Sequence, residues 1–171
     1  MLFKSFTFFA LAVAAVQALP PAGQVETGIS NLNKLVSYTK ATVEGTTAGT
    51  VKDQGAVIVA GLQHILEDTQ KQAKALTQAG AAWSMDDQAK VSKQWTTLVP
   101  TEVALFNTLA ASKSILKDQA KDISAALGNL KKAEDDLGAS LDKALPSQHD
   151  KNLSTRPQFM TAIEAAMKAF N

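Results

Sequence analysis

The sequence predicts an all-α protein, an antiparallel bundle of five to six amphipathic helices without disulfides. Apolar residues recur at steps of three and four through most of the chain, which places them on one face of each helix. No stretch shows the strict alternation of polar and apolar residues that is typical of strands. The chain also has no cysteine, so we expect apolar packing alone to stabilise the bundle.

The first eighteen residues have the pattern of a secretory signal peptide. One cation, Lys4, precedes an apolar run over residues 6–16, and Val16 and Ala18 are small residues before a cut after Ala18. This run is shorter than the roughly 20 residues that a membrane-spanning helix needs. We therefore expect a signal peptide over residues 1–18 and one helical domain over residues 19–171 in a secreted protein; association with a cell wall is left open.

The charge of the chain indicates which partners to exclude. Without Lys4, 17 basic residues become 16, against 16 acidic residues, so the net charge of the cleaved chain is close to zero. A neutral surface disfavours nucleic acid and acidic membranes as partners. No later segment is both long and uncharged, so no transmembrane segment is predicted.

Two helices are predicted in the first half of the chain. The first spans residues 25–44, and residues 45–49, with two glycines and two threonines, interrupt the pattern before a second helix over residues 51–79. The inward residues of the first helix are Val25, Ile29, Leu32, Val36, Thr39 and Val43. Those of the second are Val57, Ile58, Leu62, Ile65, Leu66, Thr69, Ala73 and Leu76.

A third helix is predicted to begin after Ser84, whose hydroxyl can cap the backbone amide of Asp87. Pro100 lacks an amide hydrogen, so we expect it to break or kink this helix and to be followed by a fourth helix or a kinked continuation. The inward residues before the proline are Met85, Val91, Trp95, Leu98 and Val99. Those after it are Val103, Phe106, Leu109 and Ile115.

The next segment has a heptad pattern that Pro146 ends. One heptad position holds Leu116, Ile123, Leu130, Leu137 and Ala144, and another holds Ala120, Leu127, Glu134 and Leu141. Because a lone buried carboxylate is costly, we expect the helix to rotate so that Ala133 lies inward and Glu134 lies at the edge. A polar loop over residues 147–155 is then expected to lead to a last helix that begins near Pro157. Its inward residues are Phe159, Ile163, Ala166, Met167 and Phe170.

The sequence offers no converging set of catalytic or metal-binding groups. His64 lies one helical turn from Glu67, but no HExxH motif or cysteine pair accompanies it. His149 and Asp150 fall in the predicted polar loop, where solvation or hydrogen bonding is the expected role. We therefore predict no catalytic residue, no metal site, no cofactor and no enzymatic activity.

Two single residues are candidates for other roles. Trp83, in the linker before the third helix, either plugs the end of the bundle or inserts into lipid or a waxy surface. Asn152 begins an Asn-Leu-Ser sequon in the predicted polar loop, where it is a glycosylation candidate. Neither alternative for Trp83 is decided by the sequence.

The order of segments resembles the fungal hydrophobic surface-binding protein A family, which includes cell wall galactomannoproteins. The matching stretches are residues 29–35 (ISNLNKL), 56–62 (AVIVAGL), 65–69 (ILEDT), 95–115 around Pro100, 129–137 (NLKKAEDDL) and 159–170. The resemblance covers nearly all of residues 19–171, through helix order and spacing rather than through a catalytic motif. It implies a secreted or wall-associated bundle that adsorbs to hydrophobic surfaces and, in some members, recruits a polyester hydrolase of the cutinase type. Related wall mannoproteins bind fatty acids between their helices.

Composition leaves the state of the interior open. Residues 19–171 contain 24 alanines and six aromatic residues, so the small side chains either allow tight packing or leave a lumen between helices. Our first hypothesis is a non-enzymatic protein that binds hydrophobic surfaces or encloses a fatty acid or other lipid. The alternative is a structural or interaction protein of the fungal cell wall or host interface. The expected lipid-lining residues are Val36, Leu62, Leu66, Phe106, Leu109, Ile123, Leu127, Leu130 and Ile163.

Overall fold

The computed structural model describes residues 20–79 and 83–171, and every regular element in these ranges is helical. The long helices are α1 (Ala22–Gly45), α2 (Val51–Ala79), α3 (Met85–Ala111), α4 (Ala120–Ala144) and α5 (His149–Phe170). Two short 3-10 turns, η2 (Lys117–Gln119) and η3 (Pro146–Gln148), flank α4. The predicted fold class is thereby confirmed, whereas the predicted signal peptide lies outside the described residues.

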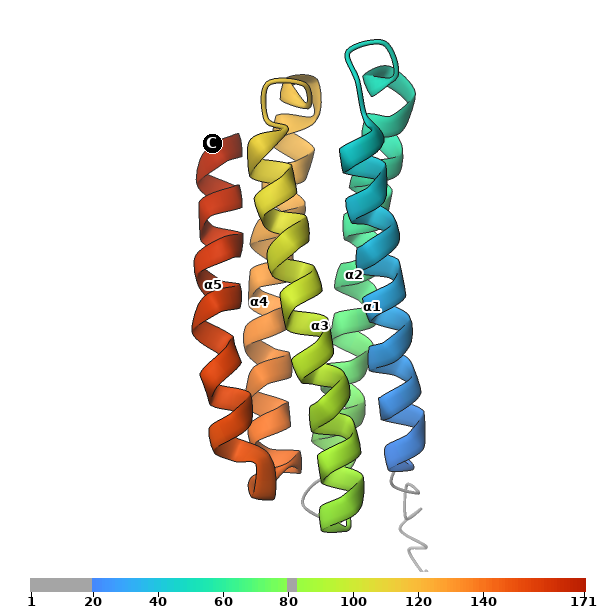
Figure 1. Ribbon diagram of the computed structural model, residues 1–171, viewed down its shortest axis with the longest axis vertical. Coiled ribbons are helices and arrows are strands. Elements are labelled where there is room, and N and C mark those ends of the chain that lie inside the picture. The colour runs from blue at the N-terminus through green and yellow to red at the C-terminus, as the bar shows by residue number, and fades with distance from the viewer. Residues whose placement is uncertain (1–19, 80–82) are drawn as a thin grey trace, which may run out of the picture.

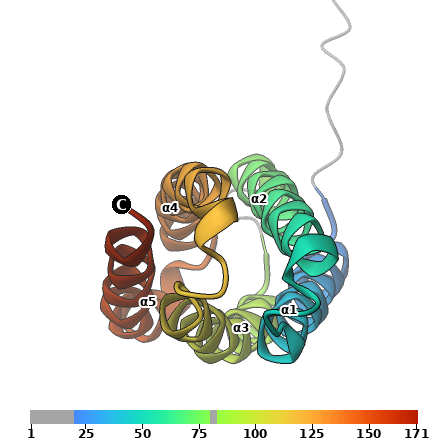
Figure 2. The same ribbon diagram turned by 90° about the horizontal axis from the view of Figure 1, so that it is seen from above.

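Consecutive long helices run antiparallel, so α1, α3 and α5 point one way and α2 and α4 the other (Figure 1). Neighbours pack in the order α1, α2, α4, α5, α3 and back to α1, which closes a ring of five helices (Figure 2). The backbones of α3 and α4 make at most marginal contact with each other, and α5 packs on both. Side chains from all five helices therefore share one interior.

The helices α1 and α2 follow the sequence pattern closely. All six residues predicted to face inward on α1 are buried, and α2 has the predicted bounds. The two helices also approach closely, since a Cβ at Gly61 would lie only 2.7 Å from the Oγ1 of Thr39. The inward prediction for Val57 is wrong, because this side chain is 45% exposed beside the fully buried Ile58.

The helix α3 starts as predicted and then continues through its proline. The backbone amide of Asp87 donates to the Oγ of Ser84 at 3.2 Å, which caps the first turn. Pro100 is exposed, so water can reach the carbonyl that loses its helical partner. The helix continues past the proline, and no separate fourth helix begins there. The inward prediction for Met85 is wrong, since the side chain is 72% exposed in the first turn of the helix.

The prediction of a polar loop over residues 147–155 is wrong. The helix α5 begins at His149, and Pro157 lies within it rather than in its first turn. Buried contacts between α5 and α3 account for this start: Ser92 donates to Asn152 at 2.9 Å, and the indole nitrogen of Trp95 donates to Thr155 at 3.2 Å. These bonds stabilise two helical turns that polar composition alone does not favour.

Candidate functional site

The residues predicted to line a lipid site lie together in the interior of the ring. They come from all five long helices and belong to one continuous apolar cluster. The side chains of Val36, Leu62, Phe106, Leu109, Ile123, Leu127, Leu130 and Ile163 are 0% exposed, and Leu66 is half-buried. Phe106 also packs edge-on against Phe159 of α5, with ring centroids 5.4 Å apart at 82°. The nine positions form a shared core, and their role as ligand contacts stays a prediction.

Four depressions of about 380–430 Å³ lie between neighbouring helices or on the turn before α5, and all open outward. None of the nine predicted lining residues borders these four depressions. Eight of the nine side chains are 0% exposed, so they are enclosed by other side chains in this conformation. A chain-like ligand would enter the apolar interior by moving these side chains or by separating neighbouring helices.

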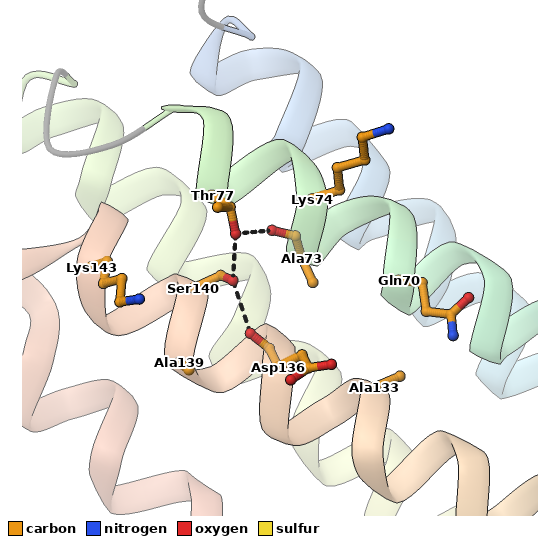
Figure 3. A pocket seen from close by; sticks show the side chains of 9 residues that line it. All are labelled: Gln70, Ala73, Lys74, Thr77, Ala133, Asp136, Ala139, Ser140 and Lys143. Carbon is orange, nitrogen blue, oxygen red and sulfur yellow. Dashed lines mark hydrogen bonds between the residues drawn. The ribbon is translucent and has the colours of Figure 1, made fainter.

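The groove between α2 and α4, of about 400 Å³, has a polar lining that suits an acyl chain poorly (Figure 3). The hydroxyl oxygens of Thr77 and Ser140 lie 2.9 Å apart across it, and Ser140 also donates to the carbonyl of Asp136 at 2.8 Å. Lys74 and Lys143 border the same groove. A lining of this kind favours water and polar groups over hydrocarbon.

Two carboxyl groups lie inside the apolar interior. Glu102 of α3 is 0% exposed and Glu134 of α4 is 3% exposed. The hydroxyl of Thr69, on α2, donates to Oε1 of Glu134 at 3.0 Å. The prediction that Glu134 lies at the helix edge is wrong, because Glu134 and Ala133 are both buried and the carboxyl has partners on two other helices.

Burial is the main cause of the altered acidity of this pair. It raises the pKa of Glu102 well above the usual range, and the charge and hydrogen bond of Glu134 raise the pKa further. Burial also raises the pKa of Glu134 to about 7, against the opposing effect of hydrogen bonds from Thr69 and Glu102. The raised pKa favours the protonated form of Glu102, in which this carboxyl is the donor of the hydrogen bond to Glu134.

Glu102 was missed by the sequence reasoning, although the periodicity contains a signal for it. It falls four residues after Leu98 and three before Leu105, both fully buried, so it occupies an inward position of α3. A carboxyl at such a position needs a partner, and the inward heptad position of Glu134 supplies one. The inward positions of Glu102 and Glu134, taken together, predict a buried pair of carboxyl groups.

The surroundings of Trp83 favour a plug over an exposed anchor. The ring is half-buried against the apolar cluster, and its indole nitrogen donates to the carbonyl of Pro20 at 3.2 Å. Its backbone carbonyl accepts from the side chain of Gln88 at 3.0 Å. Insertion of Trp83 into a surface would break these contacts, and that role stays a prediction.

Asn152, the glycosylation candidate, is only 4% exposed. Its Oδ1 accepts from Ser92, and its Nδ2, the atom that a glycan would modify, is enclosed without a partner. This conformation leaves no room for a sugar at that nitrogen. A glycan on Asn152 would therefore require the first turns of α5 to leave the bundle.

The described residues contain no group of three or more side chains suited to hold a metal ion. His64 lies 3.4 Å from the carboxylate of Glu67, and His149 lies 3.4 Å from that of Asp142. Both histidines are exposed. Among the described helices, none is long and apolar enough to cross a bilayer.

Comparison with solved structures shows that the bundle is an established fold. The structure of Afmp4p in complex with palmitic acid matches with a TM-score of 0.78 at 17% identity, over 88% of this chain and all of that one. Ligand binding domain 1 of the Penicillium marneffei MP1 protein, complexed with arachidonic acids, matches with a TM-score of 0.76 at 14% identity, over 88% and 99% of the two chains. No known family and no curated protein matches the sequence.

The protein therefore has the five-helix fold of Afmp4p and the MP1 ligand binding domain. The match extends over the full length of those domains, and the described part of this chain contains one such bundle.

Proposed function

We propose that the protein is a non-enzymatic binder of single-chain lipids, which holds a fatty acid or related amphiphile between its helices. The observation that carries this proposal is the fold, which is shared over its full length with two domains whose structures contain palmitic acid and arachidonic acids. The site would be the apolar interior enclosed by α1, α2, α3, α4 and α5.

The composition of the interior supports this proposal. It consists mainly of aliphatic side chains from all five helices, with Phe106 and Phe159 between α3 and α5. Transfer of hydrocarbon from water into such surroundings stabilises by about 25 cal/mol per Å² of apolar area. Burial of an alkyl chain would supply affinity without any reaction.

A lipid must pass between helices to reach the interior, and the absence of cysteine supports this route of entry. No disulfide ties one helix to another, so neighbouring helices can separate at the cost of packing alone. A lipid that entered would restore the buried apolar contacts that separation removes. The bundle and its ligand would thus share one core.

A secreted location is part of the proposal and is supported by the leader pattern of residues 1–18. Two further roles, adsorption to a hydrophobic surface and recruitment of a polyester hydrolase, are supported by the family resemblance alone. The exposed large apolar side chains of the described residues are Tyr38, Val57, Met85 and Leu153. Single exposed apolar residues are ordinary on soluble proteins, so the enclosed-lipid form is favoured over adsorption.

The binding site is tested with the full chain secreted from a yeast host, stripped of lipid, and titrated with a fluorescent fatty acid. Leu130→Phe adds volume in the core, where Leu130 is 0% exposed. We expect it to weaken binding about tenfold while the helical circular dichroism signal is retained, because overpacking costs about 1–3 kcal/mol.

Leu153→Phe is the matched control, since Leu153 is 39% exposed on the surface of α5. We expect this variant to bind like the wild type. Equal affinity of both variants would place the lipid outside the core, and failure of the wild type to bind any fatty acid would refute the proposed function.

A further inference from the structure

The carboxyls of Glu102 and Glu134 form a polar centre inside an otherwise apolar interior. They reach it from α3 and α4, whose backbones make at most marginal contact with each other. Thr69 joins the centre from α2. Three of the five long helices thus converge on one buried group of oxygens.

The hydrogen-bond acceptors within this centre outnumber the donors. Thr69 donates to Oε1 of Glu134, while Oε2 of Glu134 and both oxygens of Glu102 have no donor when both groups are ionised. A proton on Glu102 provides one bond, to Glu134. That leaves the second oxygen of Glu102, which is fully enclosed, as an acceptor without a donor.

Buried acceptors in native proteins are almost always paired with a donor, so an orphan of this kind calls for one. It lies within the same interior as the predicted lipid-lining residues, since Leu105 and Phe106 follow Glu102 on α3 and belong to that cluster. A ligand whose alkyl chain occupied the apolar interior could bring its polar end to this point.

We propose that Glu102 and Glu134 bind the head group of an amphiphile that donates hydrogen bonds, a long-chain alcohol or amine. This inference rests on the proposed function and names the class of lipid. A hydroxyl donates to the orphan oxygen of Glu102. An ammonium group donates to the carboxylate of Glu134 and to the orphan oxygen of Glu102, so one positive group faces one negative group while Glu102 keeps its proton.

The same centre disfavours an ionised fatty acid. A carboxylate has no hydrogen to donate, and it would add a negative charge beside Glu134 in a site that water does not reach. A fatty acid would satisfy the centre only with its proton retained. The chemistry therefore separates three ligands that have the same alkyl chain and different head groups.

The test compares hexadecanol, hexadecylamine and hexadecanoic acid as competitors of a fluorescent lipid at pH 7.5, with the full secreted chain. We expect the alcohol and the amine to bind at least about tenfold more tightly than the acid. In Glu102→Gln and Glu134→Gln, whose amides can donate to a carboxylate, this preference should shrink to about threefold or less. Glu67→Gln, an exposed position on α2, should keep the wild-type order.

Binding of all three ligands with equal affinity, or tightest binding of the acid, would overturn this inference and leave the proposed function intact. Binding of none of them would refute the proposed function itself. The wild type also offers a direct readout: the infrared band of the protonated Glu102 carboxyl should shift when hexadecanol binds, because its orphan oxygen gains a hydrogen bond. An unchanged position of that band in the bound state would contradict the proposed head-group contact.

Discussion

Ser92 of α3 donates a hydrogen bond to Asn152 of α5 at 2.9 Å, and both side chains are buried. Among the described residues, two hydrogen bonds join side chains of the parallel helices α3 and α5. The second one joins Trp95 and Thr155. These bonds explain how a polar segment becomes the first turns of a packed helix.

Ser92→Ala should destabilise the bundle by about 1–3 kcal/mol, because Oδ1 of Asn152 would lose its donor while remaining enclosed. Urea unfolding followed by circular dichroism measures this change. Ser37→Ala is the control, since this exposed serine bonds only a carbonyl of its own helix. A cost for Ser92→Ala no larger than for the control would show that the buried bond adds nothing to stability.

Asn152 should carry no glycan in the folded, secreted protein, because its Nδ2 is enclosed between α5 and its neighbours. The mass of the protein from a yeast host should equal that of the cleaved polypeptide and should not change after treatment with an N-glycosidase. Ser154→Ala, which removes the sequon, should change the mass only by the substituted side chain. A loss of mass equal to a sugar chain would contradict the buried position of Asn152.

The stability of the bundle should fall as pH rises from about 4.5 to above 7. Burial raises the pKa of Glu134 to about 7 and that of Glu102 well above its usual range, so the folded state holds more protons than the unfolded state in this window. Stability is then lost as protons leave the folded state. For Glu134 the loss is roughly 3 kcal/mol, from the displacement of the pKa from 4.5 to about 7.

Glu134→Gln should reduce this pH dependence, since the amide remains neutral and can still accept from Thr69, while burial still raises the pKa of Glu102. The free energy of unfolding at several pH values between 4.5 and 8 measures the slope. Glu67→Gln should keep the wild-type slope, because Glu67 is exposed. An identical slope in Glu134→Gln and the wild type would remove Glu134 as its source.

Trp83 should stay in contact with the end of the bundle when lipid surfaces are offered. In Trp95→Phe it is the remaining tryptophan, so its fluorescence reports on its surroundings alone. We expect no spectral shift on addition of phosphatidylcholine vesicles, because the ring is packed and its nitrogen already bonds Pro20. A blue shift on addition of vesicles would support surface insertion instead.

Local patterns were sufficient to predict most of the helices. Steps of three and four predicted the buried face of α1, and the spacing of Ser84 and Asp87 predicted the start of α3. The start of α5 depends on Ser92 and Trp95, some 60 residues earlier. No local pattern contains such contacts, and the polar composition of residues 147–155 favoured a loop.

Local patterns were also insufficient to predict the polar centre of the candidate site. The cost of a lone buried carboxylate predicted Glu134 at an edge, but Glu134 is buried because a partner, Glu102, lies 32 residues away on another helix. Only the packing of α5 against both α3 and α4 brings the two together. The apolar lining, by contrast, followed from periodicity, since inward positions of every helix in a bundle share one interior.

Lipid binding inside the bundle can be measured by native mass spectrometry of the secreted, lipid-stripped protein mixed with palmitic acid, hexadecanol or hexadecylamine. We expect complexes of one protein with one lipid, and weaker binding of each lipid by Leu130→Phe than by Leu153→Phe. A protein that remains free of all three lipids at concentrations well above those that saturate known lipid carriers would contradict this expectation.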